Sequence, residues 1–263
     1  MEANYKNWVP KGAFFVYAAG AAVAAGLFWA VNLQLRDSYF IVGLILKIIL
    51  GIIFLCFLAM LMWSVIAYRM FSYHGKRKMS MQIIEGLAEY VTLPEGGKGL
   101  DVGCGSGALT IACAKRNPQG VFVGVDRWGQ EYASFNQELC EKNAEAEGVL
   151  NVRFQSGNAK KLDFPDETFD TVTSNYVYHN ILGVDRKILL RETLRVLKKG
   201  GSFAIHDVMA EFVYGDIQKF AEELRAAGFA EVNLIPTDNG KFMTKGEGRI
   251  LLLRGSMILT GRK

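Results

Sequence analysis

Residues 100–108 read LDVGCGSGA, a short run containing one acid that breaks into three glycines. Glycine has no Cβ atom and adopts positive φ at little cost. The stretch is therefore typical of a buried strand followed by a turn whose main chain is closely approached by a ligand or by another part of the protein. In a doubly wound sheet, ligands bind beyond the carboxyl ends of the strands, and the first strand-to-helix turn contacts them. We expect Gly103, Gly105 and Gly107 to lie at a binding site.

From residue 79 onward, short apolar runs alternate with amphipathic helical patterns. This alternation predicts an α/β fold with a doubly wound, mostly parallel sheet. No convincing helix separates the last two runs, so we expect those two strands to be antiparallel. The expected strands are residues 99–102, 121–125, 152–155, 171–174, 202–205, 231–235 and 256–260, and the expected helices are residues 109–116, 130–147, 185–197 and 216–227.

The first 78 residues have a different composition. Residues 12–31 carry no charge, and residues 40–67 carry only Lys47. About 20 apolar residues cross a hydrocarbon core of roughly 30 Å, so both runs are predicted transmembrane helices. A cleaved signal peptide is the alternative for the first run, but a second apolar run follows almost at once. We therefore predict a membrane region over residues 1–78 and a second domain over residues 79–263.

Basic residues flank both runs, with Lys6 and Lys11 before the first, Arg36 between them, and Arg69 and residues 76–78 after the second. The positive-inside rule then predicts a two-span protein of the cell membrane with both termini and the second domain in the cytoplasm. The aromatic and basic residues of 68–80 suit either an interfacial segment or a simple positive flank.

Composition excludes several functions. The formal net charge of +4 comes without a basic run interleaved with aromatics, so we expect no nucleic-acid partner. The four cysteines show no CxxC spacing, which argues against a zinc site or a disulfide framework. Asp163, Asp166 and Asp170 are interpreted as turn and strand-entry residues. No metal site is predicted.

Further polar residues follow other strands. Asp126 ends the second strand about 20 residues after the glycine turn, where a carboxylate accepts hydrogen bonds from a ribose. Asn158 and Asn175 follow the third and fourth strands. The letters GCGSGA also satisfy a dinucleotide-binding fingerprint, so a nicotinamide-dependent oxidoreductase stays an alternative at this point.

Four motifs occur in order, LDVGCGSG, VGVD, GNAKKLDFPDETFD and LKKGGSF. With these motifs, residues 99–263 resemble the class I S-adenosylmethionine-dependent methyltransferases, and especially those that act on small molecules and lipid quinones. The resemblance implies a Rossmann-like sheet of seven strands with an antiparallel last strand. It also implies S-adenosyl-L-methionine as the cofactor.

The resemblance assigns roles to individual residues. The glycine turn would line the methionine and ribose portions, Asp101 would orient the turn and the ammonium group, and Asp126 would hold the ribose. Asn158 would face the adenine amino group, where the family more often has Asp, and an amide oxygen still accepts that bond. The implied cofactor-binding residues are Asp101, Gly103, Cys104, Gly105, Gly107, Asp126, Arg127, Asn158, Ala159 and Asn175, with Trp128 beside Arg127 as a further residue to pack over the adenine.

Methyl transfer from a sulfonium is an in-line displacement that depends mainly on positioning. A hydroxyl or thiol acceptor also needs a base, and an amine must arrive deprotonated. The candidates are Tyr176, Tyr178 and His179 after the fourth strand and His206 at the end of the fifth. For each histidine the alternative is a hydrogen-bonded structural group, and for each tyrosine it is packing.

Two membrane spans joined to such a domain suggest an acceptor that resides in the bilayer. We therefore expect a membrane-anchored methyltransferase acting on a lipid or lipophilic small molecule. A non-catalytic membrane sensor that binds S-adenosylmethionine is the second interpretation. The acceptor atom, the identity of the base and the oligomeric state stay open.

Overall fold

The computed structural model describes residues 2–34, 40–129 and 134–263. It divides into two compact units, Asn7–Lys78 and a larger unit that joins residues 2–6 to Met79–Lys263. The backbone N–H of Asn4 donates to Asn143 Oδ1 at 2.7 Å, and the Tyr5 hydroxyl donates to Glu147 at 3.2 Å. Residues 2–6 thus pack on the larger unit, although they precede the first apolar run.

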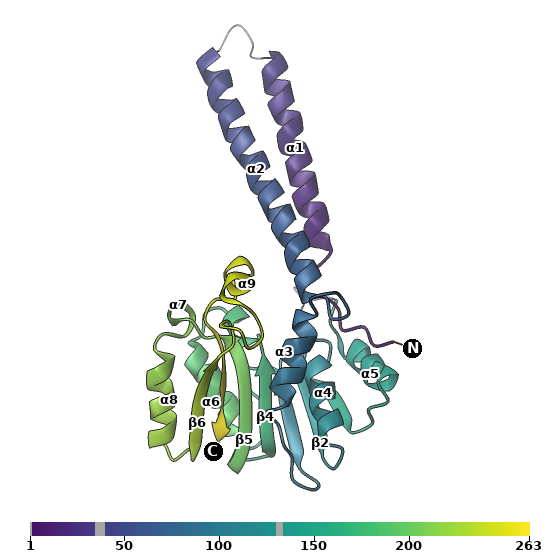
Figure 1. Ribbon diagram of the computed structural model, residues 1–263, viewed down its shortest axis with the longest axis vertical. Coiled ribbons are helices and arrows are strands. Elements are labelled where there is room, and N and C mark those ends of the chain that lie inside the picture. Colours follow the sequence, from purple (N-terminus) through teal and green to yellow (C-terminus); the bar gives the residue numbers. More distant parts are fainter. Residues whose placement is uncertain (1, 35–39, 130–133) are drawn as a thin grey trace. The chain divides into compact units, whose positions relative to one another are not determined.

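The smaller unit is a helical hairpin of α1 (Gly12–Gln34) and α2 (Phe40–Phe71) (Figure 1). A Cβ atom added at Gly20 would lie 2.5 Å from the Phe57 ring, so this glycine makes room for a large side chain of α2. At Gly51 of α2, by contrast, no described atom lies within 4 Å of such a Cβ. Arg36 lies outside the described residues.

Both hairpin helices are long and apolar enough to cross a membrane, by length and composition. Their 23 and 32 residues exceed the expected runs by one turn at the carboxyl end. At 1.5 Å per residue α2 is about 48 Å long, longer than a hydrocarbon core of about 30 Å. Its last turn carries Arg69, a residue suited to the headgroup region.

The larger unit contains a seven-stranded sheet with the order β3-β2-β1-β4-β5-β7-β6. Pairing is parallel except for β7, which is antiparallel to both of its neighbours. This confirms the expected fold class. The strands are β1 (Lys98–Val102), β2 (Val121–Asp126), β3 (Val152–Ser156), β4 (Phe169–Asn175), β5 (Leu197–Val208), β6 (Glu231–Pro236) and β7 (Ser256–Arg262).

Alternation along β1 separates the two faces of the sheet. Leu100 and Val102 enter a buried cluster that includes side chains of the helices α6 (Arg186–Arg195) and α8 (Ile217–Ala226). Asp101 points to the other face, where it meets Thr110 of α4 (Ala108–Arg116). An acid on a central strand thus lies beneath the turn that begins α4.

Several helices differ from expectation. The helix expected over residues 130–147 is α5 (Gln137–Ala146), which begins after Asn136 because the Asn136 side chain accepts a bond from Leu139 N. Residues 130–133 lie outside the described part of the chain. A short helix, α9 (Lys245–Ile250), lies between β6 and β7, where no helix was expected. The other elements are α3 (Met79–Ala88), η2 (Tyr178–Asn180) and α7 (Glu211–Tyr214).

Candidate functional site

The turn after β1 is held against the end of β2. The backbone N–H groups of Gly103 and Cys104 both donate to Val125 O, at 2.7 and 3.1 Å. Gly103, Gly105 and Gly107 have φ values of 77°, 56° and 82°. All three lie in the left-handed region that side chains disfavour, which explains why glycine occupies these positions.

What surrounds each glycine differs. A Cβ atom at Gly103 would lie 2.3 Å from Val177, and one at Gly107 would lie 3.0 Å from Phe154. At Gly105, by contrast, no atom in the described part of the chain lies within 4 Å. Gly103 and Gly107 therefore make room for the protein's own side chains. Gly105 presents bare main chain to open space, as a cofactor cradle requires.

Asp126 at the end of β2 is bonded directly to this open turn. Its Oδ2 accepts the N–H of Gly105 at 2.9 Å, and its Oδ1 accepts the N–H of Trp128 at 2.8 Å. Each carboxylate oxygen has two acceptor positions. The half-buried carboxylate thus keeps one position on each oxygen for the two hydroxyls of a ribose.

Trp128 closes one side of the turn. Its indole N–H donates to Gly105 O at 3.0 Å, and its φ of 44° is unusual for a bulky residue. The Cys140 thiol donates to the same carbonyl at 3.2 Å. Trp128 is therefore fixed beside Gly105, whereas Arg127 is exposed. The sequence named both residues without distinguishing them.

Asp101 lies beneath the turn and is 1% exposed. Its carboxylate accepts hydrogen bonds from the hydroxyls of Thr110 at 2.7 Å and Thr173 at 3.1 Å. Burial, together with the nearby charge of Asp126, raises its pKa to about 6, against the opposing effect of the two hydroxyls. Asp101 thus braces β1, β4 and α4 from below.

The remaining predicted cofactor-binding residues differ in burial and in hydrogen bonding. Cys104 is buried, and burial followed by the bond to Cys140 raises the pKa of its thiol. Asn158 is exposed, and its Oδ1 accepts the N–H of Lys160 at 3.0 Å, closing its own turn. Ala159 packs against the core. The Asn158 side chain is thus used by its own loop.

His206 is enclosed in the sheet. Nδ1 bonds to Asn175 Oδ1 at 2.9 Å and Nε2 to Thr237 Oγ1 at 2.8 Å. The side chain is fully buried, and burial lowers its pKa to about 3. A neutral ring with both nitrogens engaged is a structural group, which favours the structural alternative over the expected catalytic role. Asn175 serves as its partner.

The two tyrosines face different surroundings. Tyr178 is completely buried, and its hydroxyl bonds to Thr193 at 2.6 Å. The Tyr176 hydroxyl bonds to Ser256 at 2.8 Å, and its ring packs edge-on against His206 at 4.5 Å. Burial raises the pKa of both hydroxyls. Tyr178 is placed as a packing residue, while the half-buried Tyr176 forms a wall.

His179 is held by a buried carboxylate. Its Nδ1 bonds to Oδ1 of Asp207, which is fully buried, while the His179 side chain keeps 24% of its surface exposed. Burial alone would raise the pKa of Asp207, but the bonds from His179 and Tyr214 outweigh it and the pKa lies below its usual value. The carboxylate is therefore ionised and acts only as an acceptor.

The adjacency of His206 and Asp207 in the sequence does not by itself show whether the two side chains are partners. Alternation along β5 settles the matter, since Phe203 and Ile205 face the α6 and α8 cluster and so does Asp207. His206 points to the opposite face. Asp207 instead accepts from the backbone N–H groups of Tyr178 and His179, at 2.8 and 3.2 Å.

Known methyltransferases are similar to this chain in sequence. The family described as a methyltransferase domain matches residues 100–205. An uncharacterized methyltransferase of Bacillus subtilis (strain 168), YcgJ, is 36% identical over 121 residues, covering 43% of this chain and 44% of the relative. A demethylmenaquinone methyltransferase of Geobacillus stearothermophilus is 36% identical over 112 residues, covering 42% of this chain and 45% of the relative. The matched regions thus span less than half the length of either relative.

Residues 100–205 match the methyltransferase-domain family, and we call the larger unit that contains them the methyltransferase domain. Among solved structures, the cyclase SpnF has a TM-score of 0.54 at 21% identity, and the likeness covers 73% of this chain and 85% of that one. This likeness supports the fold alone. S-adenosylmethionine is the cofactor of the methyltransferase domain, as the family match indicates.

The residues of the methyltransferase domain fit this cofactor. Gly105 supplies main chain without an obstructing side chain, and Asp126 retains acceptor positions beside it. Asp101 adds a buried carboxylate beneath the turn. The trio offers hydrogen-bond acceptors and negative charge to a ribose and a cation.

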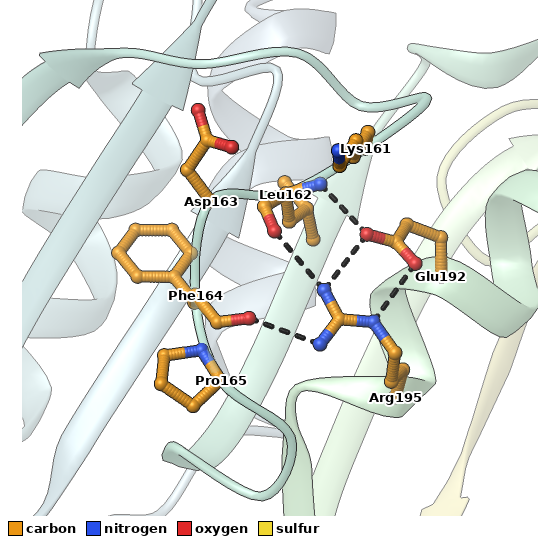
Figure 2. Close-up of a pocket in the computed structure, with 7 residues that line it drawn as sticks. All are labelled: Lys161, Leu162, Asp163, Phe164, Pro165, Glu192 and Arg195. Atoms are coloured by element: carbon orange, nitrogen blue, oxygen red, sulfur yellow. Dashed lines mark hydrogen bonds and ion pairs between the residues drawn. The ribbon is translucent and has the colours of Figure 1, made fainter.

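A separate hollow of about 540 Å³ borders the segment that leads into β4 (Figure 2). Arg195 fills its wall and donates to Glu192, Asp166 and the carbonyls of Leu162 and Phe164. These five bonds engage every N–H of a guanidinium. The hollow is lined by the loop between β3 and β4 and by the last turn of α6, and none of the residues predicted to bind the cofactor or the acceptor lines it.

Proposed function

We propose that the protein is a membrane-anchored methyltransferase that transfers a methyl group from S-adenosylmethionine to a lipophilic acceptor. The observation that carries the proposal is the presence, on one chain, of a methyltransferase domain and two helices of membrane-spanning length. A single membrane-spanning helix already anchors a domain effectively irreversibly, so two spans exceed what tethering needs. An acceptor dissolved in the bilayer explains why the chain carries a membrane-spanning hairpin.

A quinone-like ring is the acceptor class that we favour. The demethylmenaquinone methyltransferase relative supports it, because its name specifies a lipophilic quinone precursor. A reduced ring of this class carries hydroxyl groups, and the hydroxyl oxygen or a ring carbon that it activates attacks well only after the hydroxyl has lost its proton. A ring carbon that has attacked then loses its own hydrogen as a proton. The site therefore needs a base.

We assign His179 as that base. Because Asp207 is ionised and only accepts, the Nδ1 atom of His179 carries the proton that joins them, which leaves Nε2 as the atom that can take up a proton. The bound cofactor supplies an electrophilic methyl group on a sulfonium. His179 accepts the acceptor's proton at Nε2, Asp207 stabilises the resulting cation, and Tyr176 contacts His179 edge-on at 5.9 Å.

For the membrane topology, we propose that both termini and the methyltransferase domain lie in the cytoplasm. Lys6 and Lys11 precede α1, and Arg69 and the basic residues 76–78 follow the apolar part of α2. Cysteines introduced at residue 6 and at residue 76 should react with an impermeant maleimide only after the cells are opened. Reaction of either position in intact cells would overturn the orientation.

The test of the reaction uses the full chain in membranes with a lipid extract and a cofactor bearing a deuterated methyl group. We expect a lipid-soluble product that carries the label, identified by mass spectrometry. The label should be lost in Asp126→Ala. A protein that binds the cofactor but labels nothing in the extract would favour the sensor interpretation and overturn the proposal.

The role of His179 is tested separately with His179→Gln. We expect turnover to fall by about 100-fold or more, as for the loss of a general base, while cofactor affinity is retained. His74→Gln is the matched control, because His74 lies in the smaller unit and outside the proposed site. Equal turnover in His179→Gln and the wild type would show that His179 is not the base.

A further inference from the structure

The segment between β6 and β7 takes no part in the proposed methyl transfer. Residues 240–255 read GKFMTKGEGRILLLRG, with four basic residues, one acidic residue and a run of four aliphatic ones. The N-terminus of its helix α9 is capped, because Thr244 and Glu247 form a reciprocal capping box with bonds of 2.8 and 3.2 Å. The segment is therefore built as a defined element.

The end of α9 exposes aliphatic side chains. Leu251 is buried and anchors the turn, whereas Ile250 is 53% exposed and Leu252 is 74% exposed. Leu252 has a φ of 59°, at a position after a helix where glycine is usual. The left-handed conformation is unfavourable for a leucine, and the exposed side chain recovers none of that cost in water.

Other exposed apolar side chains lie in the loops that follow the carboxyl ends of β4 and β5. Phe212 in α7 is 88% exposed, and Leu182 in the loop after η2 is 77% exposed. The loop that leads into α7 is joined to the segment, since the N–H of Met209 donates to Gly255 O at 3.0 Å. Figure 1 shows α7 and α9 at the same end of the larger unit.

We propose that this surface, formed by Leu182, Phe212, Ile250 and Leu252 with the basic residues Lys241, Lys245, Arg249 and Arg254, docks on a bilayer with anionic headgroups. Charge complementarity identifies the occupant, because four exposed basic residues flank Ile250 and Leu252 along the chain and only Glu247 opposes them within the segment. Such a combination is typical of elements that bury apolar residues at the headgroup boundary while cations meet anionic lipid.

The surface also adjoins the proposed acceptor site. Phe242 of the same segment lies 5.5 Å from the His206 ring, and Ser256 at the end of the segment bonds to the Tyr176 hydroxyl. A docked segment would place the Tyr176 wall close to the lipid surface. The docking itself does not depend on methyl transfer, so its test needs no activity measurement.

The experiment uses the full chain with Cys56→Ala, because Cys56 is exposed and the other three cysteines are buried. A nitroxide is attached at Leu252→Cys, and separately at Leu150→Cys, in nanodiscs of phosphatidylcholine with and without phosphatidylglycerol. Leu150 is the matched control, being 93% exposed but located before β3, at the opposite edge of the sheet. For each nitroxide, the collision rate with oxygen is compared with the collision rate with a water-soluble nickel complex.

We expect the label at residue 252 to gain oxygen contact and lose nickel contact in the anionic nanodiscs, and the label at residue 150 to stay aqueous in both. Lys245→Glu with Arg249→Glu should shift the equilibrium toward the undocked state by at least about fivefold per charge removed. An aqueous label at residue 252 in both lipids would overturn the proposal. Equal lipid contact at residues 150 and 252 would overturn it as well.

A second variant separates docking from folding. Leu252→Gly should keep or raise the thermal unfolding temperature, because glycine suits the left-handed position. The same variant should lose the protection from hydrogen exchange that residues 245–255 gain on anionic nanodiscs. Unchanged protection in Leu252→Gly would contradict the assigned role of the leucine.

Discussion

At the scale of single residues, the glycines of the first turn divide into those that accommodate the protein and one that faces open space. Gly105→Ala places its methyl group where no described atom lies within 4 Å, whereas Gly103→Ala would drive a methyl group to 2.3 Å from Val177. Both substitutions also meet a left-handed φ that costs about 1 kcal/mol.

We therefore expect Gly105→Ala to weaken S-adenosylmethionine binding by about tenfold or more with a modest loss of stability. Gly103→Ala should lower the unfolding temperature by the larger amount. Calorimetric titration and thermal unfolding measure the two effects. If Gly105→Ala bound the cofactor as tightly as the wild type, Gly105 would not face it.

Asp101 gives a second residue-scale prediction, through the pH dependence of stability. Its pKa is raised from 3.8 to about 6, so the folded state favours the protonated form, and the associated stability is lost as the pH rises through about 6. Asp101→Asn removes this component. The variant should gain up to about 3 kcal/mol relative to the wild type between about pH 4 and about pH 8.

The measurement is thermal unfolding of both proteins, without cofactor, at the two pH values. His206, whose pKa is lowered to about 3, gives stability the opposite slope below about pH 6.5, and this slope is common to both proteins. The difference between them therefore isolates Asp101. A difference that does not change with pH would contradict the burial argument.

At the scale of elements, Arg195 of α6 ties down the loop between β3 and β4. Its five bonds require the planar fork of a guanidinium, which a lysine cannot reproduce. Arg195→Lys should destabilise the domain by about 2 kcal/mol, measured by thermal unfolding. Arg191→Lys on the same helix is the control, because its pair with Glu223 is about half exposed and should contribute less than about 1 kcal/mol. Equal losses of stability in the two variants would show that the five bonds of Arg195 contribute no more than the exposed ion pair of Arg191.

Elements with strong periodicity were predictable from sequence, because a buried strand and its following turn are encoded locally. The strands and the antiparallel last pair follow the expectation within a few residues. The helix α9 was missed, since glycines mask its pattern, although the Thr244 and Glu247 spacing is a recognisable start signal.

The acceptor side was less predictable, because its contacts join residues distant in sequence. The sequence named both His179 and His206, yet only the sheet shows that Asp207 faces the first and not the second. Similarly, Tyr176 and Tyr178 are nearly adjacent but differ in exposure, since one borders the site and the other fills the core. Packing decides these roles, and sequence spacing alone does not.

At the scale of the whole molecule, the chain combines a helical hairpin with a methyltransferase domain that has its own core. Residues 2–6 belong with the domain although they precede the hairpin, so the domain is discontinuous in sequence. A truncation that simply removes the first 78 residues would also remove contacts to Asn143 and Glu147. Shortened proteins should retain residues 2–6.

The central claim is that Gly105 and Asp126 together cradle S-adenosylmethionine, and calorimetric titration of the full chain tests it most directly. We predict saturable binding of the cofactor by the wild type and a loss of about tenfold or more in affinity for Asp126→Ala, because the carboxylate both fixes Gly105 and accepts from the ribose. Absence of binding by the wild type, or equal affinity in Asp126→Ala, would contradict the account.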